Sequence, residues 1–246
     1  MNSIDTASSF KLVLEDVTLS YQRVPAVHHV SLTLHSGRCV ALMGPNGAGK
    51  TTLLKAIAGL LPLETGRISH RGESAALAYV PQREAVDWDF PITIRGLVEM
   101  GRYPALGAFR RFGKKDHQLV EEAIILFKLE DYADRQISAL SGGQQQRAFL
   151  ARAWAQQSDI YLLDEPFSGL DDNAARSFLS SLHLLREQGK LIVASHHDFN
   201  STAEIFDTVV LLNGELIASG PTESTFTPKN LERAFSTQVF SGHKHD

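Results

Sequence analysis

The feature that most constrains this chain is a glycine-rich loop placed between an apolar run and a helical pattern. The run Cys39–Met43 is typical of a strand buried on both faces, and Thr52–Leu61 has helical spacing. Glycines let successive backbone N–H groups turn toward one point, where the following helix N-terminus adds partial positive charge. We therefore expect a phosphate-binding loop, rather than a plain glycine turn, formed by Gly44, Pro45, Asn46, Gly47, Ala48, Gly49, Lys50, Thr51 and Thr52.

The spacing of this loop also assigns two side chains. Residues 44–51 match G-x-x-x-x-G-K-[ST] in full. In such loops the lysine, here Lys50, reaches the β- and γ-phosphates of a nucleotide, and the hydroxyl of Thr51 ligates Mg²⁺.

Other segments predict an α/β fold. Apolar runs at Ile160–Leu163 and Leu191–Ala194 resemble Cys39–Met43, and helical patterns such as Gly142–Gln157 separate them, which indicates a parallel sheet. Short alternating strands are expected at Phe10–Leu14, Val17–Tyr21 and Val30–Leu34. The stretch Ile92–Gln157 is mostly helical in pattern, and we interpret it as an insertion into the α/β core.

Composition restricts the class of protein. The 246 residues carry 24 Lys and Arg against 28 Asp and Glu, a net charge of −4, which disfavours a nucleic-acid binder. The longest stretch without Asp, Glu, Lys or Arg is Val24–Gly37, whose 14 residues are too few to span a bilayer. A single cysteine, Cys39, and an N-terminus without a secretory pattern lead us to expect a soluble cytoplasmic chain.

Two adjacent carboxylates follow the apolar run Ile160–Leu163. Ligands bind at the carboxyl ends of strands in open parallel sheets, so Asp164 is expected beside Mg²⁺. Glu165, one residue further, is placed to act as general base toward a water molecule. Asp-Glu after a strand is by itself a common surface turn, but the upstream phosphate loop favours the catalytic interpretation.

A second anion site is indicated at Leu140–Gln144, which we call the signature. Ser141 is a natural N-cap for the helix that follows, and Gly142 and Gly143 leave its N–H groups exposed. A capped helix with a glycine-rich entry is the simpler interpretation. Two phosphate cradles in one chain make sense if two copies each contribute half of a shared site.

These motifs resemble the ATP-binding subunits of ATP-binding cassette (ABC) transporters over nearly the whole chain, since LSGGQ at 140–144 is absent from other P-loop classes. By this resemblance Tyr21 stacks on adenine, Gln82 contacts Mg²⁺ and signals to membrane subunits, and Ser168–Asp171 crosses a dimer interface. His197, immediately before Asp198, matches the histidine that contacts the γ-phosphate, ahead of its neighbour His196.

The resemblance implies a P-loop NTPase (RecA-like) core with an N-terminal antiparallel β subdomain and an inserted α-helical signature subdomain. The core would span 1–88 and 155–246, and the helical subdomain 89–154. Two copies would close head to tail on two ATP molecules with Mg²⁺. Each ATP would lie between one chain's Gly44–Thr52 and the other's Ser141, Gly142, Gly143 and Gln144, with Asp171 nearby. The catalytic residues would be Lys50, Gln82, Glu165 and His197, and the Mg²⁺ ligands Thr51, Gln82 and Asp164.

The implied partners are integral membrane permease subunits and, indirectly, a metal-binding solute-binding protein, at the cytoplasmic face of the inner membrane and without nucleic acid. Cargo is suggested by Arg83–Thr93 and by Met100–Tyr103, which are similar to cassettes of bacterial manganese, zinc and iron importers. Gly101–Pro104 also fits siderophore and haem importers. An exporter and a non-transport ABC ATPase are further alternatives, disfavoured because this chain has one cassette and no fused membrane helices.

Overall fold

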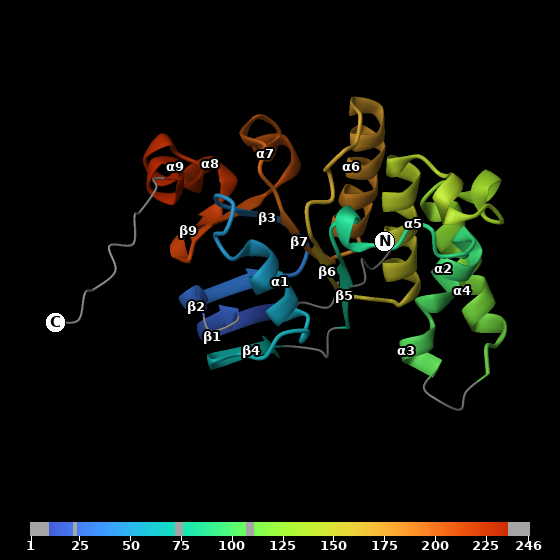
Figure 1. The fold of residues 1–246 in the computed structure, drawn as a ribbon, viewed down its shortest axis with the longest axis horizontal. Coiled ribbons are helices and arrows are strands. Elements are labelled where there is room, and N and C mark those ends of the chain that lie inside the picture. Colours follow the sequence, from blue (N-terminus) through green and yellow to red (C-terminus); the bar gives the residue numbers. More distant parts are fainter. Residues whose placement is uncertain (1–9, 22–23, 72–75, 107–110, 236–246) are drawn as a thin grey trace, which may run out of the picture.

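The computed structural model describes residues 10–21, 24–71, 76–106 and 111–235 (Figure 1). Within these ranges, none of the helices combines the length and apolar character needed to span a bilayer.

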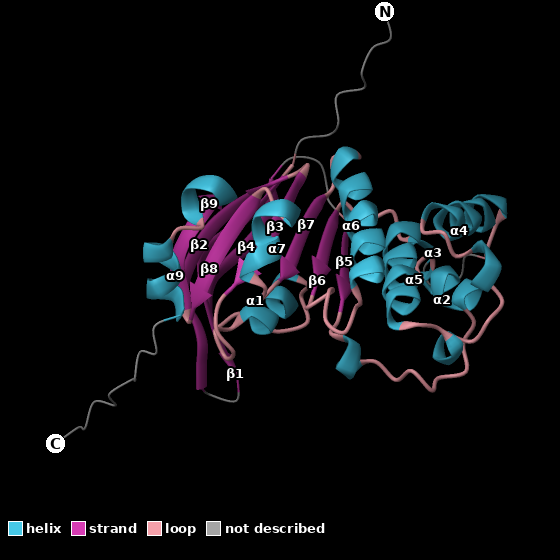
Figure 2. Cartoon of the chain, turned by 90° about the horizontal axis from the view of Figure 1, so that it is seen from above, coloured by secondary structure: helices cyan, strands magenta, loops and turns pink. Residues whose placement is uncertain are grey.

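A six-stranded sheet forms the centre of the chain (Figure 2). In spatial order its strands are β5 (Leu77–Val80), β6 (Ile160–Leu163), β7 (Leu191–Ser195), β3 (Arg38–Met43), β8 (Thr208–Asn213) and β9 (Glu215–Pro221). The first five run parallel, and β9 is antiparallel to β8. Every residue of β6 and β7 is buried, as the continuous apolar runs predicted.

A three-stranded antiparallel sheet lies beside it, in the order β2 (Val24–His35), β1 (Lys11–Tyr21) and β4 (Thr65–Arg71). The expectation of separate strands at 10–14 and 17–21 is wrong, because both belong to β1. A register shift falls between Leu14 and Val17, where Asp16 adopts a left-handed φ of 51°. Such a bulge bends a strand without ending it.

The helices of the core cover both faces of the large sheet. Val40 and Leu42 of β3 pack with α1 (Lys50–Ile57) and the antiparallel sheet, whereas Cys39, Ala41 and Met43 face α6 (Asp172–Glu187). This alternation follows from the two-residue period of a strand. The remaining helices, α7 (Phe199–Ile205), α8 (Thr222–Thr225) and α9 (Pro228–Phe235), lie toward the β8–β9 end (Figure 1).

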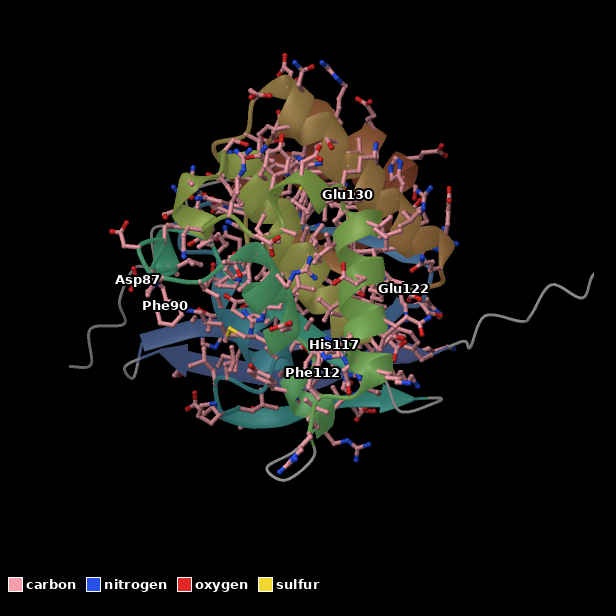
Figure 3. The ribbon with its side chains drawn as sticks, turned by 90° about the vertical axis from the view of Figure 1, so that its right-hand side faces the viewer. Asp87, Phe90, Phe112, His117, Glu122 and Glu130 are labelled. Atoms are coloured by element: carbon pink, nitrogen blue, oxygen red, sulfur yellow. The ribbon has the colours of Figure 1, made fainter. Side chains whose placement is uncertain are left out.

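The stretch expected to be helical forms a group at the β5 end of the sheet, which faces the viewer in Figure 3. It contains α2 (Ile94–Met100), α3 (Tyr103–Leu106), α4 (Lys114–Leu126), α5 (Gly142–Ala155) and 3₁₀ turns at Glu130–Tyr132 and Ile137–Ala139. A buried ion pair lies inside it, since Arg102 Nε is 3.1 Å from Asp116 Oδ1 and Nη1 donates to the Ala155 carbonyl at 2.6 Å. The 3₁₀ turn Arg83–Ala85 (η1) lies between β5 and α2.

Two helix boundaries differ from the sequence expectation. The helix predicted over 52–61 is α1, which starts at Lys50 and ends at Ile57, and Gly59 beyond it takes a left-handed φ of 72°. The helix predicted over 142–157 ends at Ala155, and Gln157 has a positive φ of 63°.

Candidate functional site

The glycine-rich loop lies between β3 and α1, where two of its glycines meet other backbone closely. A Cβ on Gly44 would lie 2.0 Å from the Leu212 carbonyl oxygen, and one on Gly49 would lie 2.5 Å from the Ala26 oxygen. Gly49 also has a left-handed φ of 91° and serves as N-cap of α1. No larger residue fits these positions without moving the backbone, which explains why glycine stands at both.

Lys50, the first residue of α1, is buried and curls back over the loop. Its Nζ donates to the carbonyl oxygens of Gly44 and Pro45, each at 2.8 Å. Burial lowers the pKa of Lys50, while the charges of Glu165 and Asp164 oppose that change. The amine thus borders a hollow of about 200 Å³ that Asn46–Thr52 and Glu165 line.

Asp164 is a buried hub at the carboxyl ends of the parallel strands. Its Oδ1 accepts hydrogen bonds from Thr51 Oγ1 at 3.0 Å and Ser195 Oγ at 2.8 Å, and its Oδ2 accepts from the Tyr79 hydroxyl at 3.3 Å. Burial and the nearby Asp164 raise the pKa of Tyr79, which therefore remains a donor. Side chains from β5, β7 and α1 thus meet on the carboxylate that directly follows β6.

Glu165 follows Asp164 in a strained backbone conformation. Its φ of 47° is rare for a residue with a side chain, and its N–H donates to Ser195 Oγ at 2.7 Å. Ser195 therefore bonds to both consecutive acidic residues. The strained turn directs the half-buried Glu165 into the hollow that Lys50 and Thr51 also line.

The two consecutive histidines have different surroundings. His196 is buried against the rings of Phe167 and Phe206, its Nε2 lies 3.0 Å from Ser201 Oγ, and burial lowers its pKa to about 4. His197 is exposed and, with Glu165, lines a second hollow of about 450 Å³. Both histidines line this hollow, but His196 is only 5% exposed, so His197 is the more accessible of the pair.

Gln82 and Tyr21 were predicted at the same site. Gln82 is half-buried two residues after the end of β5, where its backbone carbonyl accepts from the Ala85 N–H at 3.1 Å. Tyr21 is the last residue of β1, but its side chain lies outside the described residues, so its stacking on adenine stays a prediction.

The signature residues form the start of α5. Ser141 Oγ accepts from the Gln144 N–H at 3.4 Å, and Gln144 Oε1 accepts from the Ser141 N–H at 2.9 Å, which makes a capping box. A Cβ on Gly143 would lie 2.6 Å from the Ala174 Cβ of α6. Asp171 caps α6 by accepting from the Ala174 N–H at 2.8 Å. The glycines thus let the signature helix start against α6.

The single chain does not bring the signature to the glycine-rich loop. The hollow at that loop is lined by Ala26, Asn46–Thr52 and Glu165, with no residue of the signature. α1 and α5 also lie apart in Figures 1 and 2. The two predicted phosphate cradles are therefore separate within one copy.

Sequence reasoning missed two side chains of this region. Ser195 could have been predicted from the sequence, because it follows the predicted strand Leu191–Ala194 and so lies at the same edge of the sheet as Asp164. The position of Arg83 could not have been predicted, because its neighbours Gly142 and Gly169 are distant in sequence.

Comparison with known proteins identifies the family. Residues 27–168 match the ABC transporter family. The chain is 44% identical over 251 residues to the zinc transport system ATP-binding protein TroB of Treponema pallidum, covering 98% of this chain and 94% of that protein. It is 43% identical over 235 residues to the manganese transport system ATP-binding protein MntB of Bacillus subtilis, covering 94% of each.

Solved structures agree with this assignment. A putative metal-chelate type ABC transporter in an inward-facing conformation matches with a TM-score of 0.82 and 30% identity, over 92% of this chain and 88% of that one. A nucleotide-free ATP-binding cassette matches with a TM-score of 0.77 and 20% identity, over 91% and 98%, which supports the fold. The predicted fold class and family resemblance are confirmed, and the chain belongs to the ABC transporter family.

Proposed function

We propose that this chain is the ATP-hydrolysing subunit of an importer for divalent metal ions. The observation that carries the ATPase is the hub at Asp164, where Thr51 and Ser195 converge while Glu165 and Lys50 line one hollow. Metal cargo is supported by the relatives named for zinc and manganese transport, at 44% and 43% identity.

The residues at the sheet edge fit ATP bound with Mg²⁺. The Thr51 hydroxyl and the Asp164 carboxylate lie 3.0 Å apart and offer the oxygen ligands that Mg²⁺ prefers, with Gln82 as a third. When bound, Mg²⁺ would neutralise charge on the β- and γ-phosphates.

The chain's own residues then supply positioning and proton transfer. Lys50 exchanges its two carbonyl partners for phosphate oxygens, and the glycine-loop N–H groups hold the remaining charge. Glu165 accepts a proton from the water that attacks the γ-phosphorus, the bond to the bridging oxygen breaks, and ADP and phosphate result. His197, which lines the neighbouring hollow together with Glu165, would contact the γ-phosphate.

A second copy of the chain completes the site. Because Ser141–Gln144 lie away from the glycine-rich loop of their own chain, they are available to the ATP held by the other copy. The N-terminal end of a helix favours an anion, so the signature suits the γ-phosphate. Asp171 and its loop would lie at the interface between the copies.

The helical subdomain, residues 89–154, would connect this dimer to the membrane. Phe90 and Tyr103 are each 55% exposed. Figure 3 shows Phe90 at the edge of this part of the chain. We assign this face to integral permease subunits at the cytoplasmic side of the inner membrane. A metal-binding solute-binding protein would deliver cargo to those subunits.

A siderophore or haem importer is the second candidate, favoured by the structural match to a metal-chelate type transporter at 30% identity. Transport by the chain reconstituted with its permease separates the two. We expect ATP-dependent uptake of labelled Mn²⁺ or Zn²⁺. Uptake of a ferric chelate alone would support the second candidate and overturn the first.

A further inference from the structure

Arg83 lies where three segments of the chain meet. It is half-buried at the start of η1, directly after Gln82. A Cβ on Gly142 of the signature would lie 3.2 Å from Arg83 Nη1, and one on Gly169, in the loop after β6, would lie 3.7 Å from the same atom. The guanidinium therefore lies between the first turn of α5 and a loop of the core.

Trp88 holds Arg83 in this position. Its Nε1 donates to the Arg83 carbonyl at 2.8 Å, and Arg83 Cζ lies 5.7 Å from the centroid of its ring. The same ring meets Phe149 of α5 edge to face, with centroids 5.5 Å apart. Trp88 thus connects Arg83 to the signature helix at a second point, two turns beyond Gly142.

The charge of Arg83 does not serve an ion pair within the described part of the chain. It lies beside the N-terminus of α5, where a cation is unfavourable in the absence of an anion. A planar guanidinium can nevertheless fill the narrow space between two glycines while stacking on an indole ring. These contacts point to a role in geometry.

We propose that Arg83 is a positioning residue, which fixes the first turn of the signature relative to the core loop Ser168–Asp171 and to Gln82. This inference rests on the proposed function, because the positioned surface is the one offered to the ATP of a second copy. Its removal leaves the glycine-rich loop and the Asp164 hub intact. Removal of Arg83 should loosen only the signature, which contacts the ATP of the other copy across the interface.

The test measures two steps in a Glu165→Gln background, which retains ATP. Nucleotide binding to the single chain is followed with a fluorescent ATP analogue, and dimer formation is followed by light scattering as ATP is raised. For Arg83→Ala we expect unchanged binding by the single chain and an increase of about tenfold in the ATP concentration that gives half dimer. Arg83→Lys, which keeps the charge and loses the planar group, should shift dimer formation nearly as far as Arg83→Ala.

Trp88→Phe is a second variant, which keeps a ring and removes the donor to the Arg83 carbonyl. It should shift dimer formation in the same direction by a smaller factor. Arg135→Ala is the matched control, because Arg135 also stacks on an aromatic ring, with Cζ 5.1 Å from the Tyr132 centroid, but is exposed. It should leave both steps unchanged.

The outcomes separate this proposal from the function on which it rests. If the Glu165→Gln parent does not dimerise with ATP, the shared site itself is wrong. If the parent dimerises and Arg83→Ala dimerises at the same ATP concentration, the positioning role is overturned. Equal loss of single-chain binding and of dimer formation in Arg83→Ala would also overturn it, because Arg83 would then support the fold in general.

Discussion

At the edge of the parallel sheet the polar groups are bonded to one another, whereas those of the signature bond within their own helix. Thr51, Tyr79 and Ser195 all donate to Asp164, and Ser195 also accepts from the Glu165 N–H. Ser141 and Gln144 bond to each other. The first region is preassembled by long-range hydrogen bonds, and the second presents a helix end whose location depends on packing.

Because the two regions are held together differently, they should respond differently to substitution. In the sheet-edge region the groups that bind and react also fix one another, so removing Asp164 or Ser195 should disturb its partners, whereas Glu165 takes part through its backbone N–H and its side chain can be changed with local effect. In the signature region, Gly142 and Gly143 are neighbours of Arg83 and Ala174. Small steric changes at these glycines should alter how α5 packs against α6 and against the segment that contains Arg83.

The largest expected effect is on hydrolysis. Glu165→Gln removes the proposed base and keeps the backbone N–H that Ser195 accepts, so the rate of phosphate release should fall by about 10²–10⁴-fold. ATP affinity of the single chain should remain. A fall of less than about fivefold would show that Glu165 is not the base.

The next effect tests whether the helical group can be weakened separately. Arg102→Ala removes the buried guanidinium that pairs with Asp116, whose Oδ2 still accepts from the Gly113 N–H, and should lower the free energy of unfolding by about 3 kcal/mol. Limited proteolysis should then cut first within the helical group, while the remaining folded chain binds ATP at low temperature. Simultaneous loss of ATP binding and helical order would contradict the separation of the two regions.

The stability of the folded chain should depend on pH through His196, which lies in the sheet-edge region. His196 has a pKa of about 4 against an ordinary 6.5, because burial and the adjacent His197 outweigh the opposing charge of Asp198. Unfolding therefore takes up a proton between these values, so stability is complete above pH 6.5 and falls toward pH 4, by about 3 kcal/mol. Urea unfolding should show this slope in the parent and in His197→Gln, and lose it in His196→Gln.

The smallest effect concerns the packing of the signature. Gly143→Ala brings two Cβ atoms to 2.6 Å and should cost about 1–3 kcal/mol of unfolding free energy. Adding Ala174→Gly removes the clash, although glycine within a helix costs about 0.5–1 kcal/mol. A double-mutant cycle should therefore show favourable coupling, and additive effects would mean that the cost of Gly143→Ala does not come from contact with Ala174.

Much of the fold could be predicted because its central strands are continuous apolar runs. β3, β6 and β7 are buried on both faces, so sequence alone identifies them. β4 escapes the pattern, since Ile68 is the only large apolar residue in Thr65–Arg71. The bulge at Asp16 divided β1 in the sequence reading, because alternation shifts there while the strand continues.

The parts of the candidate site that consist of residues close together in sequence could be predicted. The glycine-rich loop, the Asp164–Glu165 pair and the signature each combine spacing with a strand end or a helix start. Arg83 was not predictable, because its location between Gly142 and Gly169 results from tertiary packing of three segments. Burial of His196 likewise depends on Phe167 and Phe206, which no neighbouring residue specifies.

The central claim is that each ATP needs the glycine-rich loop of one copy and the signature of the other, and mixing two inactive variants tests it directly. Lys50→Ala removes the phosphate-binding amine. Gly142→Asp places a carboxylate where the phosphate would bind, at a helix start and beside Arg83, where that charge is compatible with folding.

In a mixed dimer of these variants, one composite site carries both defects and the other carries none. We predict that each variant alone is inactive and that an equal mixture recovers about a quarter of the parent ATPase rate, since half the dimers are mixed and each has one intact site. A mixture no more active than the sum of its separate components would contradict the shared site.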